Sequence, residues 1–119
     1  MAFAVEQIPD PDALFRRIHK NHLLPEGIIS SQAFKGEQLS VNWQKYSTPE
    51  QTAIETSSAV AALIAGECRG IGRTVEHTPI EPGAEFGPNQ AHAEVCGEKD
   101  KNVHHQLRDI ANVVWRKIS

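Results

Sequence analysis

The stretch TPEQTAIETSSAVAALIAG, residues 48–66, determines how the rest of the chain is interpreted. Thr48 occupies a helix-cap position, Pro49 follows at the first helical position, and Gln51 completes a capping box. Apolar and small residues then recur at helical spacing, at positions 53, 54, 57, 60, 61 and 64, and the small side chains permit close packing on a sheet. We therefore expect a helix that begins after Thr48 and ends near Gly66 or Gly70.

The segments on either side of this helix carry strand signals. Immediately before it, apolar and polar residues alternate over residues 39–44, and this two-residue period predicts a half-buried strand. After it, β-branched residues predict a strand within residues 73–80. Residues 91–96 are expected to form a further strand, which returns from a loop rich in glycine and proline at 81–89.

Helices are expected near both ends of the chain. Asp10 and Pro11 favour a helix start, and the apolar residues at 14, 15 and 18 would supply its buried side. An apolar stripe at positions 103, 107, 110, 114 and 118 predicts the C-terminal helix. Together these elements predict an α+β fold, a two-layer sandwich in which three helices pack on a small sheet of about three strands. The edges of so small a sheet are available to a partner.

The composition indicates a single globular domain over residues 1–119. Hydrophobic residues make up 39% of the chain and charged residues 23%, which suffices for a core and argues against disorder. The formal net charge of −3 gives no general attraction for polyanions, so nucleic-acid binding would need a local basic patch. Because we see no signal-peptide pattern and no long apolar span, we predict a cytoplasmic protein without a membrane partner.

Four residues are candidates for a metal or catalytic site. On a strand, His92, Glu94 and Cys96 would share one face, and His77 would lie opposite them on a neighbouring strand. Histidine, carboxylate and thiolate can bind zinc together, and residues 92–94 match the H-x-E element of zinc deaminases. The downstream cysteine pair that completes the deaminase site is missing. The alternative, in which these side chains face solvent without a metal, is favoured, so we predict no cofactor.

The sequence also has a basic cluster, which includes Arg16, Arg17 and Lys20. Such cations can neutralise the phosphates of a nucleic acid. The alternative is a solvated helix face, in which the same cations complement the negative end of the helix dipole. The acidic net charge and an aromatic content of 6% favour this second interpretation.

Four short segments carry a resemblance to known sequences: FRRI at 15–18, SSQAF at 30–34, LSV at 39–41 and HAEVCG at 92–97. In these segments the chain resembles a group of short, uncharacterised prokaryotic proteins. The resemblance implies a small accessory product of a multi-gene operon that works with a larger protein. It assigns no activity and no catalytic residue.

Three functional hypotheses follow. The first is a small accessory or partner-binding protein, with a protein partner or a second copy of the chain bound near residues 30–34 and the loop at 81–89. The second is a small hydrolase or nucleotide-processing enzyme that uses His77, His92 and Glu94. The third is a weak nucleic-acid-binding module that uses the Arg16, Arg17 and Lys20 cluster.

Overall fold

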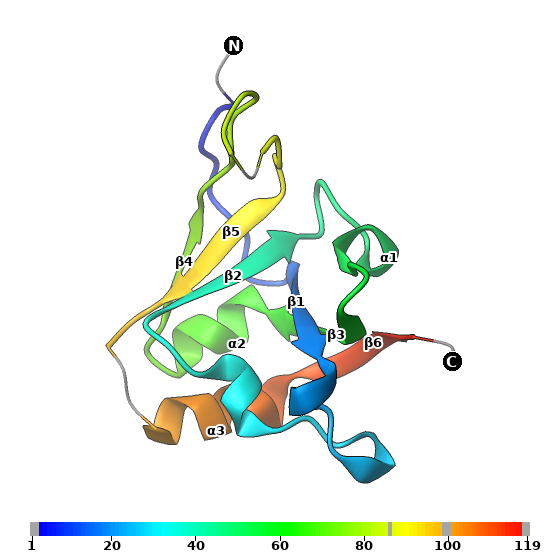
Figure 1. Ribbon diagram of the computed structural model, residues 1–119. Coiled ribbons are helices and arrows are strands. Elements are labelled where there is room, and N and C mark those ends of the chain that lie inside the picture. The colour runs from blue at the N-terminus through cyan, green and yellow to red at the C-terminus, as the bar shows by residue number, and fades with distance from the viewer. Residues whose placement is uncertain (1–2, 86, 99–100, 118–119) are drawn as a thin grey trace.

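The computed structural model describes residues 3–85, 87–98 and 101–117, and within them the strands form one six-stranded sheet (Figure 1). The strands are β1 (Ala13–His19), β2 (Gln38–Trp43), β3 (Ser57–Ile64), β4 (Thr74–His77), β5 (His92–Cys96) and β6 (Asn112–Arg116). The helices are α1 (Pro49–Thr52), α2 (Ala65–Gly70) and α3 (Lys101–Ile110), with 3-10 turns η1 (Lys20–His22), η2 (Pro25–Gly27) and η3 (Ser31–Phe34). Neighbouring strands are antiparallel, and their order is β4-β5-β2-β1-β3-β6.

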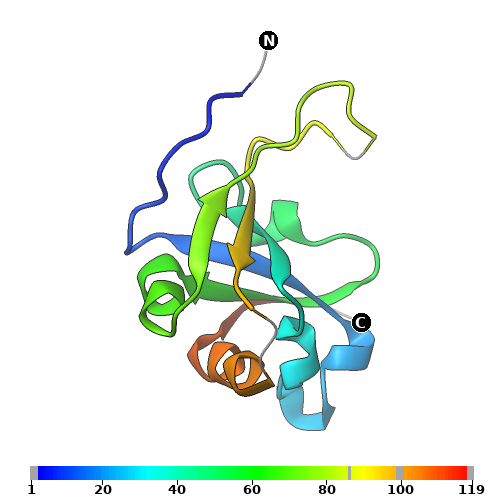
Figure 2. The ribbon, with the colours of Figure 1, turned by 90° about the vertical axis from the view of Figure 1, so that its left-hand side faces the viewer.

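The main core lies on one face of this sheet. Side chains from the central strands pack there against α2, α3 and η3, with Cys68, Leu107 and Phe34 as the buried contributions of those three elements. Helix α1 lies on the opposite face, where a small second cluster contains Phe15 and Val60. Figure 2 shows that the N-terminal segment and the β4–β5 loop both extend from the end of the sheet away from α3.

The prediction of a sheet of about three strands is wrong, because three further strands replace predicted helical residues. The largest difference is β3, which occupies the second half of the stretch at 48–66. The predicted capping box does form at Thr48, but the helix ends after one turn, at Thr52. Strand β3 is central and buried on both faces, so its apolar side chains are nearly continuous. A short apolar run of this kind has no period that distinguishes a strand from a helix.

The helix predicted after Asp10 is also wrong. Residues 13–19 form β1, which pairs with β3 along most of its length. Asp10, which suggested a helix start, and Asp12 have tertiary roles instead. The carboxylate of Asp12 accepts a hydrogen bond from Trp43 Nε1 at 2.9 Å, and the carbonyl of Asp10 accepts one from the Gly66 N–H at 2.8 Å. These bonds hold an extended chain against the sheet.

The remaining predictions are confirmed wholly or in part. The strands expected at 39–44, within 73–80 and at 91–96 correspond to β2, β4 and β5. The C-terminal helix forms as α3, but it ends at Ile110 and the chain continues as β6, so Val114 belongs to an edge strand. Position 118 lies outside the described residues. Within the described parts of the chain, each helix is too short or too polar to cross a membrane.

Candidate ligand-binding trough

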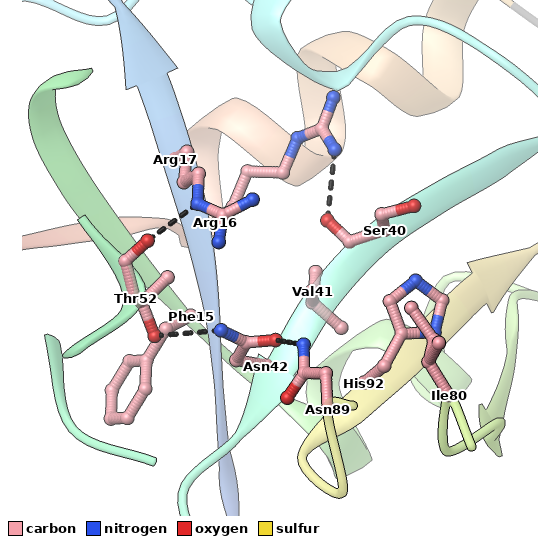
Figure 3. A pocket seen from close by; sticks show the side chains of 10 residues that line it. All are labelled: Phe15, Arg16, Arg17, Ser40, Val41, Asn42, Thr52, Ile80, Asn89 and His92. Carbon is pink, nitrogen blue, oxygen red and sulfur yellow. Dashed lines mark hydrogen bonds between the residues drawn. The ribbon is translucent and has the colours of Figure 1, made fainter. Parts of the chain in front are cut away.

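The open face of the sheet, opposite the main core, contains a cavity of about 380 Å³ (Figure 3). We call it the trough. Its floor lies on β1 and β2, and its walls are the end of α1 and the two sides of the β4–β5 connection. The described residues that line it are Phe15, Arg16, Arg17, Ser40, Val41, Asn42, Thr52, Ile80, Asn89 and His92.

The trough exists because β1 and β2 separate from each other. These two strands, both described in full, pair at Leu14–Trp43 and Phe15–Asn42 and then diverge. Arg16 extends across the gap that results. Its Nε donates to the Ala33 carbonyl at 3.1 Å and its Nη1 donates to the Ser40 carbonyl at 2.9 Å. The Arg16 side chain thus bonds the Ser40 carbonyl of β2, which a backbone N–H of a neighbouring strand would otherwise bond.

Arg17 points to the opposite side of β1 and is exposed. Its Nε donates to the carbonyl of Thr52, the last residue of α1, at 2.5 Å. In Figure 3 its terminal nitrogens carry no hydrogen bond to the other residues drawn. A guanidinium has five N–H donors, and among the described residues two of those on Arg16 and one on Arg17 have partners. Arg16 starts from the core face of β1 and borders the trough at the gap between β1 and β2, whereas Arg17 starts from the open face.

A chain of side-chain hydrogen bonds crosses the trough floor. Asn42 Nδ2 donates to Thr52 Oγ1 at 3.2 Å, and Asn89 Nδ2 donates to Asn42 Oδ1 at 2.9 Å. The carboxamide oxygen of Asn89 then accepts from the backbone N–H of Ala91 at 3.1 Å. These bonds link α1 to the β4–β5 connection and fix the orientation of both amides. The floor is therefore preorganised.

His92 is oriented by the neighbouring end of β4. Its Nδ1 lies 2.9 Å from the Thr78 carbonyl and 3.0 Å from the Thr78 hydroxyl. Because a carbonyl can only accept, Nδ1 carries the proton in this arrangement. Nε2 then has no hydrogen-bond partner in the part of the chain that the structure describes, and it is available to a ligand.

The trough is electropositive. Among the described residues that line it, none is Asp or Glu, and the ion pairs between described residues lie elsewhere, at Lys45–Glu6, Arg69–Asp10 and Arg108–Asp109. Burial, and then the charge of Arg17, lower the pKa of Arg16 from its ordinary value. Two adjacent cations, of which Arg16 is partly desolvated, favour an anion beside them.

The structure separates His77 from the other predicted site residues. His77 pairs with Ala93 and therefore faces the core, whereas His92 and Glu94 face the open side.

Both ring nitrogens of His77 have partners. Nδ1 accepts a hydrogen bond from the Glu6 N–H at 3.0 Å, and Nε2 lies 2.7 Å from the Gln90 carbonyl. Its ring packs against Trp43 with centroids 5.0 Å apart.

Glu94 and Cys96 do share the open face with His92, as expected. Glu94 lies directly opposite Glu76 of β4, and Cys96 Sγ approaches a Glu76 carboxylate oxygen at 3.7 Å. Burial, then Glu94 and Glu76, raise the pKa of the Cys96 thiol. Among the described residues, no three His, Cys, Asp or Glu side chains are placed to hold a metal ion.

Of the basic cluster, the structure brings Arg16 and Arg17 to the trough, while Lys20 lies beyond the end of β1 in η1. Sequence reasoning missed Ser40, Asn42 and Thr52 as lining residues. The polar positions of the strand predicted at 39–44 were the available signal, because they identify Ser40 and Asn42 as one face. Thr52 had no such signal, since its place depends on where α1 ends.

The chain was also compared with known proteins. No family model matches it, no curated protein matches it, and no solved structure matches it.

Proposed function

We propose that this protein is a non-catalytic binding module, an accessory protein that recognises its ligand or partner through an anionic group held in the trough. One observation carries the proposal. Arg16 and Arg17 line the same cavity, none of the described residues that line it is acidic, and most of the guanidinium donors have no partner among the described residues. Two guanidiniums together present several N–H groups to the oxygens of a phosphate, sulfate or carboxylate.

Three lining groups support the same function. The amides of Asn42 and Asn89 are held in place by their mutual hydrogen bond, and each retains one N–H that could reach an anion oxygen. His92 adds a ring nitrogen, Nε2, that has no partner among the described residues. A site rich in donors and poor in acceptors selects for negative charge.

The hydrolase hypothesis finds less support. It requires His77, His92 and Glu94 to act together, and His77 faces the core, where its two nitrogens are engaged by Glu6 and Gln90. A general acid and base must both reach the substrate. Of these three residues, His92 is the one that lines the trough.

An NMR titration tests the proposal. Inorganic phosphate added to the ¹⁵N-labelled full chain is expected to shift the Arg17 side-chain signal and the Asn42 and Asn89 amide signals along one saturable curve. Simple anion binding of this kind has Kd values on the order of 1 mM. Chloride at equal ionic strength serves as the reference, because general screening acts on all charged surfaces.

A charge-adding variant makes the titration decisive. Ser40→Asp places a carboxylate at an exposed position of the trough, where it is expected to pair with Arg16 and weaken phosphate binding by about tenfold or more. Arg108→Gln is the matched control, because Arg108 lies on α3 and pairs with Asp109. If Ser40→Asp binds phosphate as the parent does, or if the shifts do not saturate, the proposal is wrong.

A further inference from the structure

We infer that the trough binds a small phosphate monoester that carries a ring, with the chemistry of a mononucleotide. This inference rests on the proposed function, since it names the ligand class of the same site. Three independent features of the trough lead to it: its size, the distribution of polar and apolar groups around it, and the acidic residues beside it.

The size favours a single small molecule. Cavities that hold small ligands and cofactors begin at about 300 Å³, and the trough encloses about 380 Å³. An inorganic anion alone would leave most of this space unfilled. A molecule made of one phosphate, one sugar and one planar ring has a volume of the same order as this cavity. α1 and the β4–β5 connection bound the trough on two sides, which limits its length.

The two cationic side chains and Ile80 lie at different parts of the lining. Arg16 and Arg17 come from β1, whereas Ile80 and His92 come from the segments on the far side of β2 (Figure 3). Ile80 is partly exposed, so its apolar surface is available to a flat ring. Asn89, between these groups, offers an amide that can bond a sugar hydroxyl or a base edge. A phosphate at one end and a ring at the other match this division.

The acidic residues beside the trough argue against a nucleic-acid strand. Glu94 lies opposite Ser40 on β5, and Glu76 lies opposite Glu94 on β4. A strand that left the trough across β5 and β4 would bring its next phosphates over these two carboxylates. Like charges in proximity are unfavourable, and the chain as a whole carries a formal charge of −3. A single phosphate avoids this repulsion.

Calorimetric titration of the full chain tests the inference with four kinds of probe. They are inorganic phosphate, ribose 5-phosphate, the four ribonucleoside 5′-monophosphates, and the matching nucleosides. At least one nucleotide is expected to bind about tenfold more tightly than inorganic phosphate. Ribose 5-phosphate tests whether the sugar alone supplies the gain. Nucleosides are expected to bind at least tenfold more weakly than the nucleotides, because they lack the group that Arg16 and Arg17 would hold.

A matched pair of variants separates the ring contact from the phosphate contact. Ile80→Ala removes apolar surface from the trough and is expected to weaken nucleotide binding about threefold to tenfold while phosphate binding is unchanged. Ile54→Ala is the control, because Ile54 is 50% exposed and does not line the trough. Equal losses in both variants, or equal losses for nucleotide and phosphate in Ile80→Ala, would overturn the ring contact.

The outcomes distinguish the two proposals. If inorganic phosphate binds and no nucleotide or sugar phosphate binds more tightly, the binding module stands and the inference fails. A single-stranded oligonucleotide that binds more tightly per site than every mononucleotide also refutes the inference. If nucleosides bind as tightly as nucleotides, the inference fails, and if neither phosphate nor any phosphate ester binds, both proposals fail.

Discussion

Arg16 shows how one side chain can determine both the shape and the charge of a site. In the alternation of β1 it shares the face of Leu14 and Ile18, which are fully buried. Its guanidinium reaches the carbonyls of Ala33 and Ser40 and so remains hydrogen-bonded despite its burial. Burying a charge is costly unless such bonds compensate it. The same residue spans the gap between β1 and β2 and places positive charge there.

The two cysteines are expected to differ sharply in reactivity. Burial, and then the charge of Glu67, raise the pKa of Cys68 to about 11, and this residue is fully buried. Cys96 is partly exposed, although its pKa is also raised. At about pH 8, a thiol reagent is expected to modify Cys96 slowly and Cys68 only after unfolding, since the thiolate is the nucleophile. Rapid modification of two thiols in the native protein would contradict this, and Cys96→Ala identifies which residue reacts.

The raised pKa of Cys68 also predicts a loss of stability at high pH. Because the pKa of Cys68 in the folded state lies above the ordinary thiol value of about 9, the unfolded state releases its proton first as the pH rises. Stability is therefore unaffected below about pH 9 and falls by about 2 kcal/mol by pH 11. Urea unfolding across this range measures the loss. Cys68→Ala is expected to be less stable at neutral pH but to lack this part of the pH dependence.

At the scale of elements, the sequence predicted the half-buried strands and missed the others. Strand β2 alternates clearly because one of its faces carries Leu39, Val41 and Trp43 and the other carries polar residues. Strand β3 has no alternation because both of its faces are covered. In β6, a bulge next to Val60 leaves Val114 exposed and interrupts the two-residue period. Which strands are covered depends on the assembled sheet, so local patterns could not reveal it.

The same reasoning explains why the site was predicted in part. Arg16 and Arg17 were identified as a cluster because they are adjacent in sequence. The trough also needs Asn42, Asn89 and Thr52, which lie on different elements and meet only in the folded chain. The order of β5, β2 and β1 brings them together, and the strand order was not predictable from local patterns.

The short helix α1 links local structure to the trough. Thr48 accepts a hydrogen bond from the Gln51 N–H at 3.1 Å, and the Gln51 side chain accepts from the Thr48 N–H at 3.1 Å. Thr48→Ala removes the first bond and is expected to cost about 1 kcal/mol of stability in urea unfolding. It is also expected to weaken phosphate binding, since Thr52 holds Arg17. Thr56→Ala, at an exposed position outside the helix, is the control, and an equal effect of the two changes would refute the capping role.

The whole molecule protects the two outer strands of its sheet by different means. The β6 edge carries the bulge at Val114, which disturbs the regular backbone spacing that a further strand would need. The N-terminal segment lies beside β4, where the Glu6 N–H donates to His77 and Arg69 bonds the Ile8 carbonyl at 2.7 Å. Both features disfavour the addition of a further strand at these edges.

The contacts of the N-terminal segment predict a loss of stability in acid. The carboxylate of Glu6 accepts hydrogen bonds from Lys45 and Tyr46, and these two bonds lower the pKa of Glu6 below 4.5. A lowered folded pKa means that the contribution to stability is present above about pH 4.5 and is lost as the pH falls through the folded value. Thermal unfolding is therefore expected to show Glu6→Gln as less stable than the parent at neutral pH, by a difference that shrinks as the pH falls below about 4.5.

Hydrogen exchange locates this effect in the structure. In Glu6→Gln at neutral pH, the amides of residues 3–10 and of β4 are expected to exchange faster than in the parent, because the segment and the strand are joined through His77. The amides of β3, which lies between β1 and β6 and far from β4 in the strand order, are expected to be unchanged. Glu85→Gln, an exposed loop position, controls for the loss of one negative charge. If both variants change exchange equally, net charge rather than the Glu6 contacts holds the segment, and protection of the β4 edge must have another source.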